Sequence, residues 1–89
     1  MNLAQTPLGQ MVRVNALHLP AELAQRLAAL GLRLESEVTV LRRGWLGGPL
    51  QLRVGGTELM LRRDAAQGIE VTVLPSMALN ESSVAEVAA

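Results

Sequence analysis

Five short stretches of the sequence alternate aliphatic with polar residues, and glycine or proline residues separate most of them. Alternation with a period of two is typical of a β-strand that buries one face. The stretches cover residues 11–16, 37–42, 50–54, 57–61 and 69–73. This many short strands joined by tight turns favours a small closed β-barrel, because closure removes exposed sheet edges from a very aliphatic chain.

The same alternation predicts which side chains face the barrel interior. The expected inward residues are Val12, Val14, Ala16, Val38, Val40, Leu50, Leu52, Val54, Thr57, Leu59, Leu61, Ile69, Val71 and Val73. The pair Gly55-Gly56 separates two of the strands by two residues, which predicts a tight hairpin turn. Thr6-Pro7-Leu8-Gly9 predicts a turn that leads into the first strand.

One helix is expected between the first two strands, over residues 20–30. Its apolar stripe is Leu23, Leu27 and Leu30, spaced for one helix face turned to the core. Pro20 suits the first turn, and Gly31 suits the left-handed position after the helix, so that Leu32 folds back onto the last turn.

A second, single helical turn is expected at residues 65–67, with Asp64 as its cap and Gly68 as its end. We assign residues 1–75 to one barrel domain and residues 76–89 to a flexible tail, because the tail has no convincing periodicity. Ser83 and Glu86 have capping-box spacing, but too little chain follows for a stable helix.

The charge and the cysteine content exclude several classes of function. Eight arginines balance eight acidic residues, and this neutrality argues against a nucleic-acid binder. The sequence has no cysteine, no signal peptide and no membrane-spanning apolar run, so we expect a cytoplasmic protein without direct membrane insertion. Hydrophobic residues are 49% of the chain, which makes a homo-oligomer reasonable.

The sequence contains few residues suited to catalysis or metal binding. We assign no catalytic residue, no cofactor site and no metal site, and we expect no enzyme. His18 is the only histidine, and with Glu22 it would form only a partial metal site that needs further ligands. Glu35 and Glu37 are interpreted as solvated carboxylates at a turn.

The stretch Gly44-Trp45-Leu46-Gly47-Gly48-Pro49 holds the only aromatic residue, flanked by glycine in a predicted loop. Two readings of Trp45 stay open. It is either an exposed binding hot spot beside Leu46, or it folds back and caps one end of the barrel. We name Arg43, Trp45, Leu46, Gly47, Gly48 and Pro49 as the candidate partner-binding residues.

Two basic pairs, Arg42-Arg43 and Arg62-Arg63, stand at strand ends. They contact either acidic groups of a protein partner or phosphates or, as we favour, the chain's own glutamates across the sheet. The expected glutamate partners are Glu37, Glu58 and Glu70.

The ordered series of motifs resembles the FeoA family. The matching residues are Leu8-Gly9, Leu27, Leu30-Gly31-Leu32, Val38-Thr39-Val40, Gly47-Gly48-Pro49, Val54, Gly56-Thr57, Leu61-Arg62, Ala66, Ile69 and Val71. The resemblance covers about residues 6–74. It implies a mainly β, SH3-like barrel of about five strands with one helix inserted after the first strand.

The resemblance also implies a function. It suggests a non-enzymatic accessory protein of bacterial ferrous iron uptake that docks on the membrane transporter FeoB, at its cytoplasmic GTPase-bearing region. The protein would then lie at the inner membrane only through this partner. The alternative is a stand-alone interaction module that self-associates or binds a metal-dependent repressor.

The sequence departs from the family pattern twice. Leu34-Glu35 replaces the usual Pro-Gly before the second strand, and Gly44-Trp45 replaces the usual Ala-Pro in the loop. The second change makes the loop tip bulkier and more apolar than the family pattern.

Overall fold

Five antiparallel strands form one sheet in the order β4-β3-β2-β1-β5 in the computed structural model, which describes residues 1–74. The predicted mainly β fold, with one helix after the first strand, is confirmed. The elements are η1 (Leu3–Gln5), β1 (Met11–Leu17), α1 (Ala21–Ala29), β2 (Glu37–Arg43), η2 (Trp45–Gly47), β3 (Leu50–Val54), β4 (Thr57–Leu61), α2 (Arg63–Gln67) and β5 (Ile69–Val73). The predicted tail, 76–89, and its capping box lie outside the described residues.

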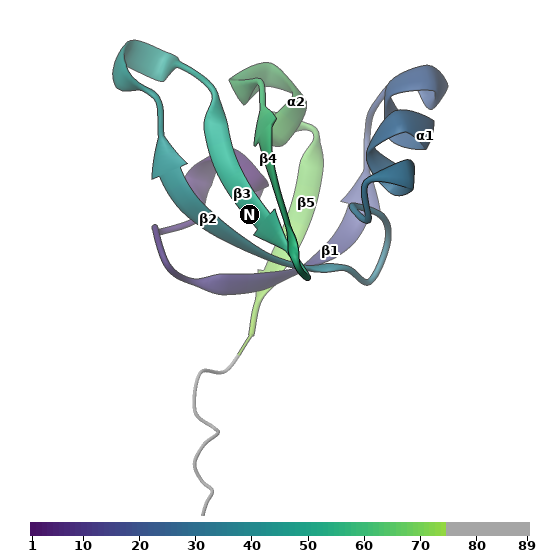
Figure 1. The fold of residues 1–89 in the computed structure, drawn as a ribbon, viewed down its shortest axis with the longest axis horizontal. Helices are drawn as coiled ribbons and strands as arrows, with labels where there is room; N and C mark the ends of the chain where they lie inside the picture. Colours follow the sequence, from purple (N-terminus) through teal and green to yellow (C-terminus); the bar gives the residue numbers. More distant parts are fainter. Residues whose placement is uncertain (75–89) are drawn as a thin grey trace, which may run out of the picture.

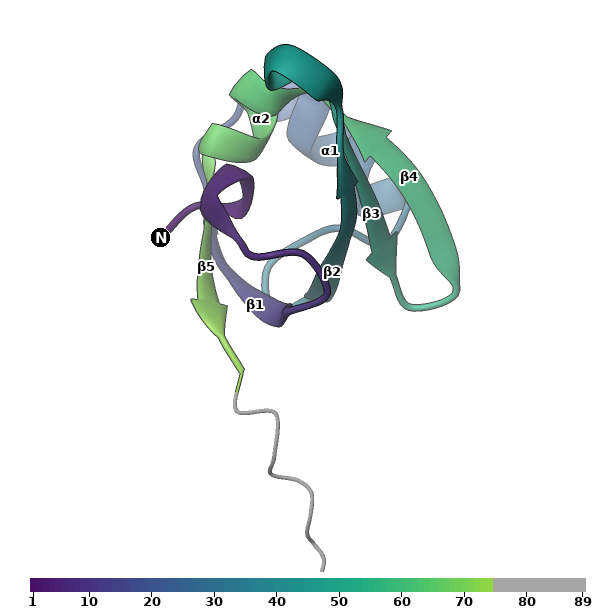
Figure 2. The same cartoon turned by 90° about the vertical axis from the view of Figure 1, so that its left-hand side faces the viewer.

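The sheet curls around a central core, as Figure 2 shows in a view along the barrel. Register shifts in β1, between Val14 and Ala16, and in β2, between Val40 and Arg42, help the strands to bend. The end strands β4 and β5 are joined by α2 (Figure 1), and α2 packs against η1. Within residues 1–74, β4 and β5 do not pair with each other, so strand pairing does not close the barrel, and the short helices α2 and η1 pack together beside β5.

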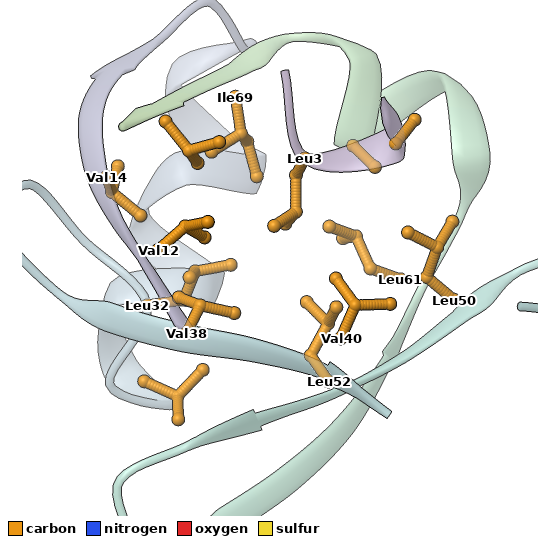
Figure 3. Close-up of a cluster of buried hydrophobic side chains, with 14 of the residues drawn as sticks. Leu3, Val12, Val14, Leu32, Val38, Val40, Leu50, Leu52, Leu61 and Ile69 are labelled. Carbon is orange, nitrogen blue, oxygen red and sulfur yellow. The ribbon is translucent and has the colours of Figure 1, made fainter. Parts of the chain in front are cut away.

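The core fills the inside of this curled sheet (Figure 3). Its fully buried members include Val12 and Val14 from β1, Val38 and Val40 from β2, and Leu50 and Leu52 from β3. These six residues were predicted to point inward. Full burial of one such side chain stabilises the fold by about 2 kcal/mol, so the sheet carries most of the hydrophobic free energy.

The N-terminal segment contributes to this core, which the strand and helix patterns do not predict. Leu3 is fully buried and lies near the centre of Figure 3. Asn2 and Gln5 form a capping box around η1, since each side chain accepts a hydrogen bond from the other's backbone N–H. The Met1 carbonyl accepts a hydrogen bond of 2.9 Å from the Val71 N–H, which fixes the segment to β5.

Helix α1 ends as predicted, but its apolar stripe is only partly buried. Gly31 has φ of +101°, and Gly31 and Leu32 donate to Ala28 and Leu27 in the Schellman pattern. Leu27 is the buried residue of the helix, whereas Leu30 is 44% exposed and Leu23 is half-buried. The prediction of a fully buried stripe was wrong, because α1 lies beside the barrel and only one of its sides touches the core.

Three smaller predictions were also wrong. Thr57 and Val73 are exposed rather than inward, because each lies at the outer end of a terminal strand of the sheet. Asp64 lies in the first turn of α2, and the residue at the cap position is Arg62, which makes no side-chain cap hydrogen bond. Gly68 does end this helix, as predicted.

Replacing Glu35 by glycine is expected to stabilise the domain by about 1 kcal/mol. Glu35 is exposed and has φ of +73°, a left-handed conformation that a Cβ atom disfavours. Glycine takes this conformation without the penalty. Chemical denaturation with urea would measure the change.

Glu37→Gly is the control for this prediction, because Glu37 lies two residues further on in regular β2. It should destabilise the domain by roughly 0.5–1 kcal/mol, as glycine does within a strand. If Glu35→Gly lowers stability as much as Glu37→Gly does, the left-handed conformation carries no measurable strain.

Candidate functional site: an exposed loop between two strands

The candidate site is the loop of residues 44–49 between β2 and β3. Arg43 pairs with Leu50 in the sheet register, so the loop starts and ends on adjacent strands. The Gly44 N–H donates a hydrogen bond of 2.7 Å to the Pro49 carbonyl and closes the base. The loop projects at the same end of the barrel as α2 in Figures 1 and 2.

The tip of the loop turns its apolar side chains to the outside. Leu46 has φ of +53° and Gly47 has φ of +76°, so two successive residues are left-handed. Trp45 is 87% exposed and Leu46 is 84% exposed. Of the two readings left open by the sequence, the capping one is wrong, since a tryptophan that covered the barrel end would be buried.

Glycine is required at the base of this loop for space rather than for its backbone angles. A Cβ atom on Gly44 would lie 2.8 Å from the Pro49 carbonyl oxygen, closer than such atoms approach in proteins. A Cβ atom on Gly48 would lie 3.1 Å from the Trp45 carbonyl oxygen. The two ends of the loop therefore pack backbone against backbone, which holds the tip in one shape.

Two arginines lie beside the loop. The Arg43 guanidinium donates a hydrogen bond to the carbonyl oxygen of buried Thr6, and so links the loop base to the N-terminal segment. The Arg63 side chain lies against Gly47, with its Cδ 3.7 Å from where a Cβ would stand. Arg63 is a residue of this site that sequence reasoning missed, because no spacing rule relates positions 47 and 63.

The predicted pairing of the basic pairs with glutamates across the sheet was wrong. Glu37 pairs with Arg13 at 3.4 Å, Glu58 with Arg53 at 3.3 Å, and Glu70 with His18 at 2.7 Å. Glu37 and Glu58 pair instead with the arginines that lie directly opposite them in the sheet register, Arg13 and Arg53. All three pairs are substantially exposed, so each contributes little to stability.

The only histidine does not meet the acidic residue suggested by its spacing. His18 Nε2 contacts a carboxylate oxygen of Glu70 on β5, not Glu22. Within residues 1–74, no three or more His, Cys, Asp or Glu side chains gather as a metal site would require. Over the same range, no helix has both the length and the apolar character needed to cross a membrane.

Comparison with known proteins identifies the family. The family model described as the FeoA domain matches residues 1–73. The chain belongs to the FeoA family. This confirms the resemblance inferred from the motifs.

Solved structures of FeoA proteins share this fold. The FeoA protein from Chlorobium tepidum is 32% identical, with a TM-score of 0.79 over 83% of this chain and 70% of that one. The zinc-complexed FeoA from Stenotrophomonas maltophilia is 33% identical, with a TM-score of 0.68 over 81% and 89% of the two chains. It is described as an SH3 domain protein and a suggested activating factor of ferrous iron transport.

A third structure, iron(II) transport protein A from Clostridium thermocellum, is 28% identical, with a TM-score of 0.77 over 83% of this chain. The present chain spans 46% of that protein's length. No curated protein sequence matched the chain. The SH3-like barrel predicted from the FeoA motifs is thus confirmed. The exposed apolar residues Trp45 and Leu46 lie on a loop of this barrel.

Proposed function

We propose that this FeoA-family chain is a non-enzymatic accessory protein of bacterial ferrous iron uptake that docks on FeoB through the 44–49 loop. The observation that carries the proposal is the exposure of Trp45 and Leu46 side by side on a loop whose base is tightly packed. The family association with ferrous iron transport supports the choice of the transporter as partner.

The loop has the chemistry of a protein-binding site. Tryptophan is among the residues that contribute most to protein interfaces, because it removes a large apolar area from water. At 87% and 84% exposed, Trp45 and Leu46 leave almost all of their side-chain area available. Burial of both against a partner would contribute about 2–3 kcal/mol from each side chain.

The shape of the loop also supports docking. Leu46 holds a left-handed conformation that leucine disfavours by roughly 1–2 kcal/mol. The loop base sustains this conformation, since it is closed by the Gly44–Pro49 hydrogen bond and by the close backbone packing at Gly44 and Gly48. A loop that is ordered before binding loses less conformational entropy on association, so more of the contact energy appears as affinity.

The docking partner that we propose is the cytoplasmic, GTPase-bearing region of FeoB. Contact with this region would place the protein at the inner membrane through its partner, without insertion of its own chain. The loop offers apolar side chains and backbone groups, so its role in this proposal is to bind and not to catalyse a reaction.

Trp45→Ala is expected to abolish detectable binding to the purified cytoplasmic region of FeoB, or to weaken it at least ten-fold. Loss of a central tryptophan typically costs an interface 2 kcal/mol or more. Isothermal titration calorimetry, with and without a GTP analogue, measures the affinity. Because Trp45 is the only tryptophan, a blue shift of the wild-type fluorescence on binding would report burial of the loop tip.

Leu34→Ala is the matched control, because Leu34 is also an exposed leucine but belongs to the connection between α1 and β2. It should bind as the wild type does. The free energy of unfolding of both variants should lie within about 0.5 kcal/mol of the wild-type value, as is usual for substitutions of exposed side chains. Unchanged binding by Trp45→Ala, or absence of wild-type binding in every nucleotide state, would contradict the proposed docking.

A further inference from the structure

Strand β4 presents an edge that the described part of the chain does not cover. The two strands at the ends of the sheet order are β4 and β5. The N-terminal segment lies along β5, through the bridge between Asn2 and Glu70 and the hydrogen bond from Val71 to Met1. Among residues 1–74, no strand or bridge lies along the outer edge of β4.

The register shows which backbone groups of β4 face this edge. Val54 and Thr57 flank the two-residue turn and pair with each other, as the hydrogen-bonded pair of a tight hairpin does. Hydrogen-bonded and non-hydrogen-bonded pairs alternate along an antiparallel ladder. The backbone groups of Glu58 and Met60 therefore point away from β3. Arg62 continues the edge, since its φ of −63° and ψ of 148° are extended.

Apolar side chains surround this open edge. Met60 is 61% exposed on the strand itself. A groove of about 250 Å³ runs between α1 and β4, lined in part by Leu23, Leu30 and Leu59. The incomplete burial of the α1 stripe is thus located beside the unpaired strand. An open strand edge with apolar neighbours is a surface on which another strand readily adds.

We propose that β4 pairs with β4 of a second copy of this chain, antiparallel and centred on Met60, to give a two-fold symmetric dimer. This inference does not depend on the docking proposed above, because it uses a different element. In this register Met60 faces its own symmetry mate, and Glu58 faces Arg62 of the second copy. One sheet then continues through both barrels.

Charge distinguishes this register from its neighbours. A dimer centred on Met60 sets two opposite-charge pairs across the new ladder, since Glu58 and Arg62 are equally far from Met60 in sequence. A dimer centred on Leu59 would set Glu58 opposite Met60, and one centred on Glu58 would set two glutamates opposite each other. Glu58 already contacts Arg53, but its side chain is 48% exposed and its carboxylate can accept further hydrogen bonds.

Disulfide trapping tests the proposal, because the chain has no cysteine of its own. In the proposed register the two Met60 Cα atoms form a hydrogen-bonded pair about 5.5 Å apart. This separation is within the range that a disulfide spans. Met60→Cys should therefore form a covalent dimer under mild oxidation. Met11→Cys is the matched control, since Met11 is another exposed methionine but lies on β1, which is paired on both sides, and this variant should stay largely monomeric.

Charge reversal provides a second test by analytical ultracentrifugation. Glu58→Arg and Arg62→Glu should each weaken the dimer about ten-fold, because each places like charges opposite at two symmetric positions. The double variant should recover the wild-type affinity. Thermal melts of all variants verify that they are folded. A wild-type chain that stays monomeric up to about 1 mM, or equal disulfide trapping at positions 11 and 60, would overturn the proposal.

Discussion

Leu27→Asp should unfold the domain at room temperature. Leu27 is only 4% exposed and is the buried residue through which α1 packs on the core. An ionised carboxylate there would lose its hydration without gaining a partner, at a cost of several kcal/mol, in addition to the lost leucine contacts. A domain of this size has a stability near the low end of the usual 5–15 kcal/mol. Circular dichroism before and during a thermal melt would show the loss of structure.

Leu30→Asp is the control, because it introduces the same carboxylate one turn further along the predicted stripe. Leu30 is 44% exposed, so the carboxylate stays hydrated, and the cost should be about 1 kcal/mol from its unfavourable position at the helix C-terminus. The contrast between the two variants tests whether α1 is attached to the barrel through Leu27. A cooperative melt of Leu27→Asp near the wild-type temperature would show that it is not.

Gly68→Ala should destabilise the domain by about 2–3 kcal/mol. A Cβ atom on Gly68 would lie 2.6 Å from the carbonyl oxygen of His18 and 3.1 Å from Leu19 Cδ2. The His18 oxygen belongs to the backbone and cannot rotate away. The Gly68 carbonyl also accepts a hydrogen bond of 2.7 Å from the His18 N–H, so separating the two segments would weaken this contact. The free energy of unfolding in urea would measure the effect.

Gly56→Ala is the matched control for this substitution. A Cβ atom on Gly56 meets nothing within 4 Å, because the residue lies at the exposed hairpin turn. The free energy of unfolding of the Gly56→Ala variant should stay within about 0.5 kcal/mol of the wild-type value, which is usual for exposed sites. If Gly68→Ala were equally mild, the close approach between residues 18 and 68 would have to relax at little cost.

The two proposed surfaces belong to different elements and can be tested separately. The docking proposal uses the 44–49 loop, which connects β2 and β3. The dimer proposal uses β4 and the exposed side of α1. Trp45→Ala should therefore leave the oligomeric state unchanged, and Met60→Cys in its reduced form should leave FeoB binding unchanged.

The strands, the main helix and their order could be predicted from the sequence. A strand that buries one face alternates buried and exposed side chains, so the spacing of residues such as Val38 and Val40 shows which side chains face the core. Gly31 marked the end of α1 because few other residues take a left-handed conformation there. Family motifs then identified the SH3-like barrel. All of these signals are local, and they can be read without knowing what lies across the core.

For the candidate site, the sequence predicted the loop and its chemistry but not the orientation of its tip. Alternation cannot say whether Trp45 turns inward or outward, because this depends on the left-handed Leu46 and on backbone packing at Gly44. The hydrogen bond of Arg43 to Thr6 and the position of Arg63 near Gly47 involve residues far apart in the chain. No spacing rule predicts such contacts.

Which apolar residues outside the strands are buried depends on how distant segments pack together. Leu3 lies in a segment too short to show a periodicity, yet it fills the centre of the core because η1 covers the side of the barrel near α2. Leu30 belongs to the predicted apolar stripe of α1, but it stays exposed beside the groove between α1 and β4. Hydrophobicity shows which side chains gain from burial, whereas the packing of distant segments determines which of them find a surface to cover them.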